Sequence, residues 1–331
     1  MMSAVGAVAR WIAPFLTVVA VAGLGLQAAP TPAPSVRLAA DDGNPLAGAT
    51  FYVNPTSAAM RAAQKADPPS PELTAIANTP QAYWLVPGSS AATVAKYVGD
   101  AQAAGAMPVF ALYGIPHRDC GSFAAGGFAS AAEYKGWVDG IAADIGGSPA
   151  AVIVEPDALA MADCLSGDQR QERYDLIRYA VETLTRNPAA AVYIDAGHLR
   201  WHSADDMAAR LNQAGVAQAR GFSLNTANFF TTDDEIGYGE AISGLTNGSH
   251  YVIDTSRNGA GPAPSSALDW CNPDGRALGT PPTTATAGAH ADAYLWIKRP
   301  GESDGSCNRG DPPAGNFVTQ FAVELARNAG H

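Results

Sequence analysis

Short apolar runs recur along the chain, and turn-forming or charged residues follow each of them. A continuous apolar run bounded by turn residues is typical of a strand that is buried on both faces of a parallel sheet. The pattern predicts strands at eight places: residues 51–53, 83–86, 108–113, 151–155, 192–195, 221–224, 251–254 and 293–297.

Amphipathic stretches lie between most of these runs. Apolar residues spaced three or four apart predict helices over residues 93–104, 133–145, 169–185, 205–214 and 318–326. Alternating strands and helices indicate a parallel α/β architecture. About eight strands in roughly 285 residues suit a single (β/α) barrel, and a doubly wound open sheet is the alternative. No Gly-x-Gly-x-x-Gly follows the first strand and no Walker motif occurs, so nucleotide binding has no support.

Acidic side chains stand at or just beyond the ends of four of the predicted strands. They are Asp119, Glu155, Asp157, Asp195, Glu302 and Asp304. In barrels of parallel strands, catalytic groups project from the carboxyl ends of the strands. Carboxylates gathered there would share one cleft, and such a cleft suits acid–base chemistry on a neutral, hydroxyl-rich substrate.

Each acidic residue also has an ordinary structural interpretation. Asp157 precedes a stretch that could begin a helix, and this local motif alone favours a helix N-cap. Asp304 precedes Gly305, and Asp-Gly is first of all a turn signal. Three local pairs are also possible: Arg118 with Asp119, Asp195 with His198, and Lys298 with Glu302. The placement of the carboxylates after successive strands is what favours a catalytic function.

Three tryptophans fall at a strand end or in the loop that follows: Trp84, Trp201 and Trp270. Tryptophan fills cores by default, but an indole also stacks on the apolar face of a sugar ring. Asn225 and Asn228 would add amide contacts, unless they bond to the backbone of their own loop. The Gly- and Pro-rich segment 258–286 is too long for an idle loop and is predicted to form one wall of the cleft. Together these residues indicate a saccharide groove.

The charge balance narrows the choice of partners. The 331 residues carry a formal net charge of −11, only 15% are charged, and no basic cluster occurs. Nucleic acids and anionic membranes attract Lys/Arg patches, so neither is an expected partner. We expect a monomer that uses no cofactor and no metal ion.

The N-terminus has the pattern of an export signal. Arg10 is the only early charge, residues 11–26 are apolar, and small residues follow at 27–30. The apolar run is shorter than the ~20 residues of a bilayer span, although an uncleaved anchor is the alternative. The sequence therefore predicts a signal peptide at 1–29, a flexible lead-in at 30–46 and one folded domain at 47–331.

Four cysteines occur: Cys120, Cys164, Cys271 and Cys307. An even number in an exported chain implies disulfides, with three possible pairings. The gaps between the cysteines are dozens of residues, so a zinc site is a weak alternative.

Several motifs resemble glycoside hydrolase family 6, the cellulases that cleave β-1,4-glucan with inversion. They are VIVEPD at 152–157, YIDAGH at 193–198, DTSRNG at 254–259, WCNP at 270–273 and LWIKRPGESDG at 295–305. The resemblance covers about residues 48–328 in order, and actinobacterial members look most similar. It implies a distorted barrel with about seven parallel strands in one domain.

The resemblance also implies roles for individual residues. Asp157 matches the general acid, and Asp119 matches a carboxylate that raises the pKa of the acid and stabilises the transition state. Asp304 matches the proposed base, and Asp195 matches a supporting carboxylate. Tyr113 matches a tyrosine that crowds the distorted sugar. Sugar-binding positions match Trp84, His198, Trp201, Asn228, Trp270, Lys298 and Glu302, and the cysteines match the disulfides Cys120–Cys164 and Cys271–Cys307.

One residue departs from the family pattern. Ala125 stands where the family commonly has a serine that helps to hold the attacking water, so Ser122 or the backbone would take over that task. Cellobiohydrolases of the family cover the cleft with two long loops, whereas only a short segment separates Cys307 from Phe317 here. The resemblance therefore implies an open groove and internal cleavage. We therefore expect a secreted, inverting endo-β-1,4-glucanase. The alternatives are a catalytically impaired β-glucan-binding protein, which the alanine suggests, and a hydrolase of a related envelope glucan.

Overall fold

The computed structural model describes residues 43–266, 268–307 and 310–331. The predicted signal peptide and the lead-in up to residue 42 lie outside the described residues. Within the described ranges, none of the helices is both long enough and apolar enough to cross a membrane.

The core of the fold is one sheet of seven parallel strands, in which chain order equals spatial order. The strands are β1 (Tyr83–Leu85), β2 (Val109–Leu112), β3 (Ala150–Val154), β4 (Ala190–Asp195), β5 (Gly221–Leu224), β6 (His250–Asp254) and β7 (Ala291–Leu295). The sheet curls until its two edges approach each other. Ala82 N–H donates to the carbonyl of Trp296 at 2.9 Å, and the indole Nε1–H of Trp84 donates to the carbonyl of Ile297 at 2.8 Å. The predicted distorted barrel with about seven strands is confirmed.

The strand predicted at residues 51–53 is wrong, because only Phe51 bridges the sheet, at Met107. Pro55 follows shortly after and has no N–H to donate to a ladder. The side chain of Asn54 accepts a hydrogen bond from Thr56 N–H at 2.8 Å, which turns the chain away.

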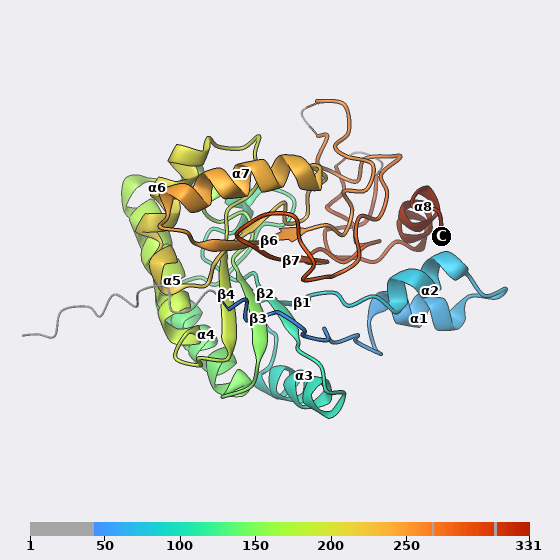
Figure 1. Ribbon diagram of the computed structural model, residues 1–331, viewed down its shortest axis with the longest axis horizontal. Coiled ribbons are helices and arrows are strands. Elements are labelled where there is room, and N and C mark those ends of the chain that lie inside the picture. Colours follow the sequence, from blue (N-terminus) through green and yellow to red (C-terminus); the bar gives the residue numbers. More distant parts are fainter. Residues whose placement is uncertain (1–42, 267, 308–309) are drawn as a thin grey trace, which may run out of the picture. The chain divides into compact units, whose positions relative to one another are not determined.

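Eight helices are present among the described residues: α1 (Ala58–Lys65), α2 (Pro71–Ala77), α3 (Ala91–Ala103), α4 (Ala131–Ile145), α5 (Gly167–Leu184), α6 (Ala204–Gln213), α7 (Thr232–Leu245) and α8 (Thr319–Asn328). The five predicted helices correspond to α3, α4, α5, α6 and α8. Figure 1 shows α3 to α7 around the outside of the sheet and α1, α2 and α8 grouped at one end. Seven of the eight begin at a serine or threonine whose side chain accepts a backbone N–H of the first turn.

Helices α1, α2 and α7 were not predicted, and α7 shows why. Its buried face contains Glu235, Gly239 and Ser243 beside Tyr238 and Ile242, so it lacks a clear apolar stripe. Gly239 is required there because a Cβ would lie 2.7 Å from the ring of Tyr251 on β6. Close packing against the sheet, rather than hydrophobicity, fixes this helix.

Strand residues point alternately into the barrel and toward the helices. The inner set includes Ala111, Ala151, Ile153 and Ala293, and the outer set faces the helices. Larger inner side chains such as Tyr193 and Leu295 pack with these small ones in the same cluster. The rigid barrel therefore supports the loops that leave the carboxyl ends of its strands.

Candidate active site

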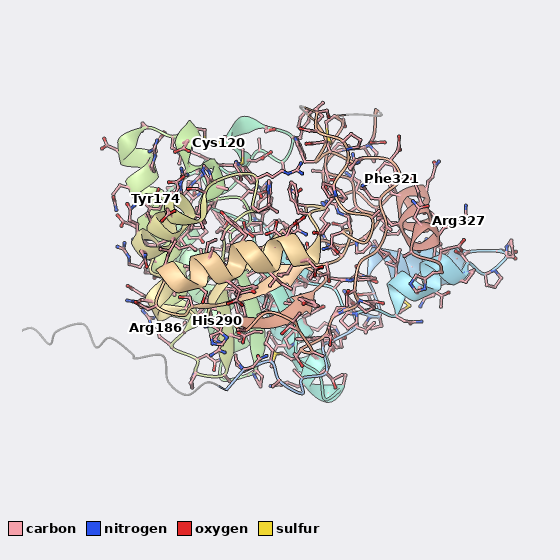
Figure 2. All side chains as sticks on the ribbon, turned by 45° about the horizontal axis from the view of Figure 1, so that its top comes forward. Cys120, Tyr174, Arg186, His290, Phe321 and Arg327 are labelled. Carbon is pink, nitrogen blue, oxygen red and sulfur yellow. A yellow bond between two sulfur atoms is a disulfide. The ribbon has the colours of Figure 1, made fainter. Side chains whose placement is uncertain are left out.

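The acidic cluster lies at the carboxyl ends of the strands, the end of the molecule where Figure 2 labels Cys120, opposite His290. Backbone strain concentrates here. Asp119, Cys120, Glu155 and Asp157 all have φ between 49° and 68°. L-residues seldom adopt such angles, and they persist where the surroundings enforce them, often at functional sites.

Asp157 and Asp195 are coupled through the backbone. Asp157 N–H donates to Asp195 Oδ1 at 2.9 Å, and Gly197 N–H donates to the same oxygen at 3.1 Å. The hydroxyl of Ser223 donates to Asp195 Oδ2 at 3.0 Å. Burial raises the pKa of Asp195 to about 6, although these hydrogen bonds act to lower it. Asp195 makes no bond to His198, so the predicted local pair is wrong: its oxygens are occupied by nearer donors.

Asp157 is partly exposed, and its carboxyl hydrogen-bonds to none of the described residues. Burial raises its pKa well above the usual range, and the charges of Asp195 and Asp119 raise it further. The N-cap interpretation is wrong, because the following 3₁₀ turn begins at Ala160 with Leu159 as its N-cap. A carboxyl that keeps its proton near neutral pH can serve as a general acid.

Asp119 occupies the loop after β2. Its Oδ2 accepts the N–H of Ala124 at 2.6 Å. Burial raises the pKa of Asp119, and the bond from Ala124 and the charge of Arg118 oppose that rise. The predicted Arg118–Asp119 ion pair does not form, because Arg118 donates to the carbonyls of Ala124 and Tyr113 at 2.9 and 2.7 Å. Its guanidinium also lies 4.5 Å from the ring centre of Tyr113.

Asp304 is buried between two cations. Arg257 Nη1 contacts its Oδ2 at 2.8 Å and Lys298 Nζ contacts its Oδ1 at 3.1 Å. Asn272 N–H also donates to Oδ2, at 3.1 Å. Burial acts to raise the pKa of Asp304, but the two cations and this bond lower it overall. The predicted Lys298–Glu302 pair is wrong, because Glu302 pairs with Arg299 at 2.8 Å.

In two pairs of aromatic residues, one member lies in the loop after β2, which also carries Asp119. The rings of Trp84 and Tyr113 are 5.2 Å apart, edge to face. The ring of Trp270 lies 6.0 Å from that of Phe123. Burial raises the pKa of Tyr113 well above its usual value, so its hydroxyl stays protonated.

His198 and Trp201 lie together in the loop after β4, with ring centres 5.2 Å apart. Burial and the charges of Arg200 and His202 lower the pKa of His198 to about 4, so its imidazole is neutral near pH 7. Asn225 and Asn228 differ from each other. Asn225 is fully buried and its Nδ2 donates to the carbonyls of Phe230 and Asp254, so it holds its own loop. Asn228 is partly exposed.

Both disulfides pair as predicted. Cys120 and Cys164 have Cα atoms 6.2 Å apart, and Cys271 and Cys307 have Cα atoms 6.3 Å apart. These separations lie within the range for disulfides. The first bond adjoins Asp119 and the second lies close to Asp304, so each fixes a loop that carries a carboxylate.

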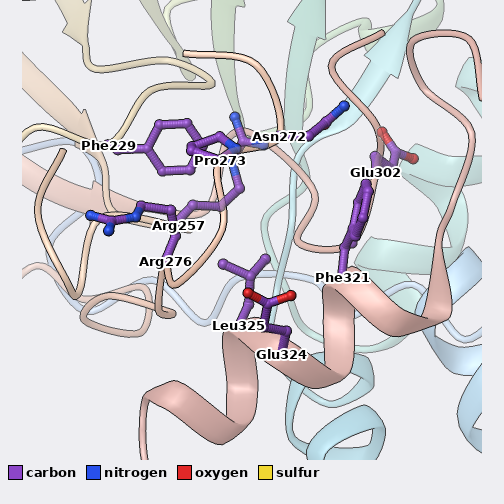
Figure 3. Close-up of a pocket in the computed structure, with 10 residues that line it drawn as sticks. Phe229, Arg257, Asn272, Pro273, Arg276, Glu302, Phe321, Glu324 and Leu325 are labelled. Atoms are coloured by element: carbon purple, nitrogen blue, oxygen red, sulfur yellow. The ribbon is translucent and has the colours of Figure 1, made fainter. Parts of the chain in front are cut away.

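A small cavity is lined in part by Arg257 and Asn272, two of the residues that contact Asp304 (Figure 3). It is lined by Phe229, Arg257, Asn272, Pro273, Arg276, Gly301, Glu302, Phe321, Glu324 and Leu325. Its volume of about 20 Å³ is roughly the room that one water molecule needs. A sugar cannot enter a cavity of this size. No group of three or more His, Cys, Asp or Glu side chains arranged for a metal ion occurs in the part of the chain that the structure describes.

A family model described as "Glycosyl hydrolases family 6" matches residues 46–329. The chain belongs to this family. It is 49% identical to Endoglucanase A of Cellulomonas fimi over 284 residues, which cover 84% of this chain and 61% of that protein. It is 42% identical to Endoglucanase A of Thermobispora bispora over 290 residues, with coverages of 84% and 62%. The chain thus spans about three fifths of the length of these two relatives.

One solved structure is very similar to this family 6 chain. It is the endoglucanase Cel6 from Mycobacterium tuberculosis in complex with methyl-cellobiosyl-4-deoxy-4-thio-β-D-cellobioside. The sequences are 73% identical, the TM-score is 0.86, and the match covers 87% of this chain and 100% of that chain.

Sequence reasoning missed several residues that hold the family 6 site together. Arg257 lies in the DTSRNG motif but was given no role. Asp254, which ends β6, accepts the N–H groups of Ala227 and Lys298 at 3.0 and 2.8 Å. Glu155, which follows β3, was predicted among the strand-end carboxylates but without this supporting role: it accepts the N–H groups of Gly114 and Ile115, each at 3.0 Å. Their position after a strand was a usable signal, but it does not distinguish a supporting carboxylate from a reacting one.

Proposed function

We propose that this family 6 chain is an endo-β-1,4-glucanase that inverts the anomeric configuration, with Asp157 as its general acid. The partly exposed carboxyl of Asp157, whose pKa is raised by burial and by the neighbouring Asp195, is the observation that carries the proposal. The names of the two bacterial relatives and the cellobioside-based ligand of the tuberculosis protein support a β-1,4-glucan as the substrate.

In this mechanism Asp157 gives its proton to the glycosidic oxygen as the bond to the sugar breaks. A water molecule then attacks the opposite face of the sugar, and an inverting enzyme holds its two carboxyl groups about 6.5–9.5 Å apart to admit that water. Burial, together with the negative charges of Asp195 and Asp119, raises the pKa of Asp157 and so favours the form that carries the proton to the leaving oxygen.

The environments of Asp119 and Asp304 suggest different roles. Asp304 is held ionised by Arg257 and Lys298, so it is a poor proton acceptor. It is instead suited to stabilise the positive charge that develops on the sugar. Asp119 has a raised pKa and bonds only to a backbone N–H, and we therefore assign to it the removal of the proton from the attacking water.

The remaining predicted residues would bind the glucan. These are Trp84, Tyr113, His198, Trp201, Asn228, Trp270, Lys298 and Glu302. Residues 312–315 lie against Ser303, whose hydroxyl donates to the carbonyl of Pro312 at 2.8 Å and whose carbonyl accepts the N–H of Gly315 at 2.9 Å. A segment tied down in this way leaves the groove open, which supports internal cleavage. Two disulfides suit an oxidising compartment, and we propose that the chain is exported and acts as a monomer.

A second candidate function is glucan binding without turnover, and Ala125 is the observation that favours it. The alanine offers no hydroxyl for the attacking water, and its N–H donates to the carbonyl of Ser122 at 3.1 Å. Ser122 is exposed and nearby in the same loop.

The deciding experiment measures reducing-sugar release from carboxymethylcellulose by the wild type, Asp157→Ala and the exposed control Asp205→Ala. We expect the control to match the wild type and Asp157→Ala to lose roughly 10²–10⁴-fold in rate. On an aryl cellobioside with a very good leaving group, the rate of Asp157→Ala should fall far less, because that leaving group needs little protonation. The first product should be the α-anomer by NMR. If even the wild type releases no sugar, the chain is a binding protein.

A further inference from the structure

Glu235 is a fully buried carboxyl beside the loop that carries His198 and Trp201. It lies in the first turn of α7 and is 0% exposed. Its Oε1 accepts the N–H of Leu199 at 3.3 Å. Its Oε2 is buried without a hydrogen-bond partner among the described residues. Burying a carboxyl with one oxygen unpaired destabilises the folded protein. The presence of Glu235 therefore calls for a functional reason, and the loop that it contacts supplies one.

The start of α7 contacts this loop at three points. The ring of Phe230, just before the helix, lies 4.4 Å from the ring of His198. Glu235 accepts from Leu199, and the hydroxyl of Tyr238 donates to the carbonyl of His202 at 2.9 Å. The contacts fall on both sides of Trp201 and beside His198. Helix α7 therefore clamps the loop from one end to the other, and Glu235 is the central contact.

The loop itself is a tight turn with one internal backbone hydrogen bond, from Trp201 N–H to the carbonyl of His198 at 3.0 Å, and its other contacts come from neighbouring elements. Gly197 has a φ of 65°, and a Cβ there would lie 3.2 Å from the ring of Trp201. Its N–H donates to Asp195 at the end of β4. Two carboxyls therefore accept backbone N–H groups of this turn. Asp195 accepts from Gly197, just before His198, and Glu235 accepts from Leu199, just after His198.

The surroundings of Glu235 favour its neutral form. Burial raises the pKa of Glu235 to about 8, and the negative charges of Asp234 and Asp195 raise it further. Tyr238 faces it from the next turn of α7. On the loop side, the imidazole of His198 is neutral, and Arg200 lies over the ring of Phe230 at 5.1 Å. His202 is paired with Asp206 at 2.9 Å.

We propose that Glu235 is a positioning residue that holds the loop 196–202 so that His198 and Trp201 face the glucan. The inference rests on the proposed function, in which these two side chains bind sugar. Glu235 touches no reacting atom, so it should govern affinity rather than the chemical step. Ionisation would place a charge near Asp195 in a dry interior, and the loop would have to rearrange to solvate it.

The test measures the affinity of cellohexaose for Asp157→Ala protein and, in the active enzyme, KM and kcat on carboxymethylcellulose. We expect Glu235→Ala to weaken binding and raise KM by roughly tenfold while kcat changes less than twofold. Glu235→Gln keeps the oxygen that accepts from Leu199 and cannot ionise. At pH 6 it should bind like its parent within twofold. Above pH 8 the parent should lose affinity and Glu235→Gln should not.

Two further variants separate the possible explanations. Glu240→Ala removes another carboxylate of α7, which bonds to Tyr251 and His290 away from the loop. It should lower the melting temperature without weakening binding, so an equal loss of affinity would overturn the proposal. Trp201→Ala tests whether the loop binds sugar. If it binds cellohexaose normally, the loop does not bind sugar and the role of Glu235 is refuted, whereas reducing-sugar release by the wild type and Asp157→Ala decides the proposed function separately.

If Trp201→Ala loses affinity and Glu235→Ala does not, only the role of Glu235 is refuted. If Glu235→Ala does not fold, the comparison at high pH decides. Parallel pH profiles for Glu235→Gln and its parent would then overturn the proposal.

Discussion

Replacing Arg257 with methionine should destabilise the protein and slow catalysis through Asp304. Both members of this ion pair are buried, with side-chain exposures of 3% and 5%. Methionine keeps the apolar stem that packs near Phe229 but removes the guanidinium, which lies 4.3 Å from that ring. Asp304 would keep only Lys298 and the N–H of Asn272 as partners.

The size of the effect follows from those remaining partners. Breaking a buried ion pair by removing one member typically costs about 3–5 kcal/mol. Two partners survive here, so we expect the lower end, about 3 kcal/mol. At ~2.1 cal/mol/K per residue, a domain of roughly 280 residues has an unfolding entropy of about 0.6 kcal/mol/K, so the melting temperature should fall by ~5 °C.

The loss should depend on pH in a defined direction. Asp304 has a lowered pKa in the folded state, so it contributes stability above its unfolded value near 3.8, which is lost as the pH falls through the folded value. Without Arg257 that pKa rises. The difference in stability between wild type and Arg257→Met should therefore be full at pH 7 and shrink below about pH 4.

Thermal and urea unfolding at pH 7 and pH 3.5, together with kcat on carboxymethylcellulose, test this reasoning. Arg220→Met is the matched control, because Arg220 pairs at 2.8 Å with the buried Asp292 at the opposite ends of the strands. It should lose similar stability yet keep the wild-type kcat, whereas Arg257→Met should lose at least about tenfold in kcat. A stability loss under 1 kcal/mol in Arg257→Met, or an equal fall in kcat for both variants, would refute the argument.

Two further predictions concern the loops that carry the carboxylates. Replacing Cys271 and Cys307 by serine opens a loop with a sequence separation of 36 and should cost roughly 3–4 kcal/mol, or about 5–7 °C in melting temperature; identical melting of the variant and the oxidised wild type would contradict this. Ala125→Ser should raise kcat by roughly two- to tenfold with KM nearly unchanged, if water positioning limits turnover. Ser122→Ala should slow the enzyme instead if that hydroxyl already holds the water, and no effect of either change would exclude this loop from water delivery.

The strands and most of the helices could be predicted because local patterns of apolar residues indicate which of their residues are buried. Most residues of β2 to β7 are buried and apolar, and α5 carries a regular apolar stripe. Helix α7 could not be predicted in this way, since Glu235 and Gly239 stand at core-facing positions. These residues are fixed by what α7 packs against, namely the loop after β4 and the ring of Tyr251, and a local pattern contains neither.

Predictions of local side-chain pairs failed for a related reason. Arg118 and Asp119 are neighbours in sequence, but backbone carbonyls and a backbone N–H satisfy them separately. Lys298 turns to Asp304 rather than to Glu302, and the second cation at Asp304 comes from Arg257, 47 residues away. Buried charges take the partners that desolvate together with them, and the fold decides which residues those are.

The same principle explains how one cleft can hold carboxylates in different protonation states. Asp157 is partly buried beside Asp195 and Asp119 with no cation in direct contact, so its pKa rises. Asp304, in the same acidic cluster, lies between two cations and its pKa falls. The sequence supplies four strand-end aspartates of the same chemical type, and their roles diverge only when the fold places Arg257 and Lys298 against one of them. Position along the chain therefore predicts where the chemistry occurs, and the distribution of buried cations predicts which carboxyl acts as the acid.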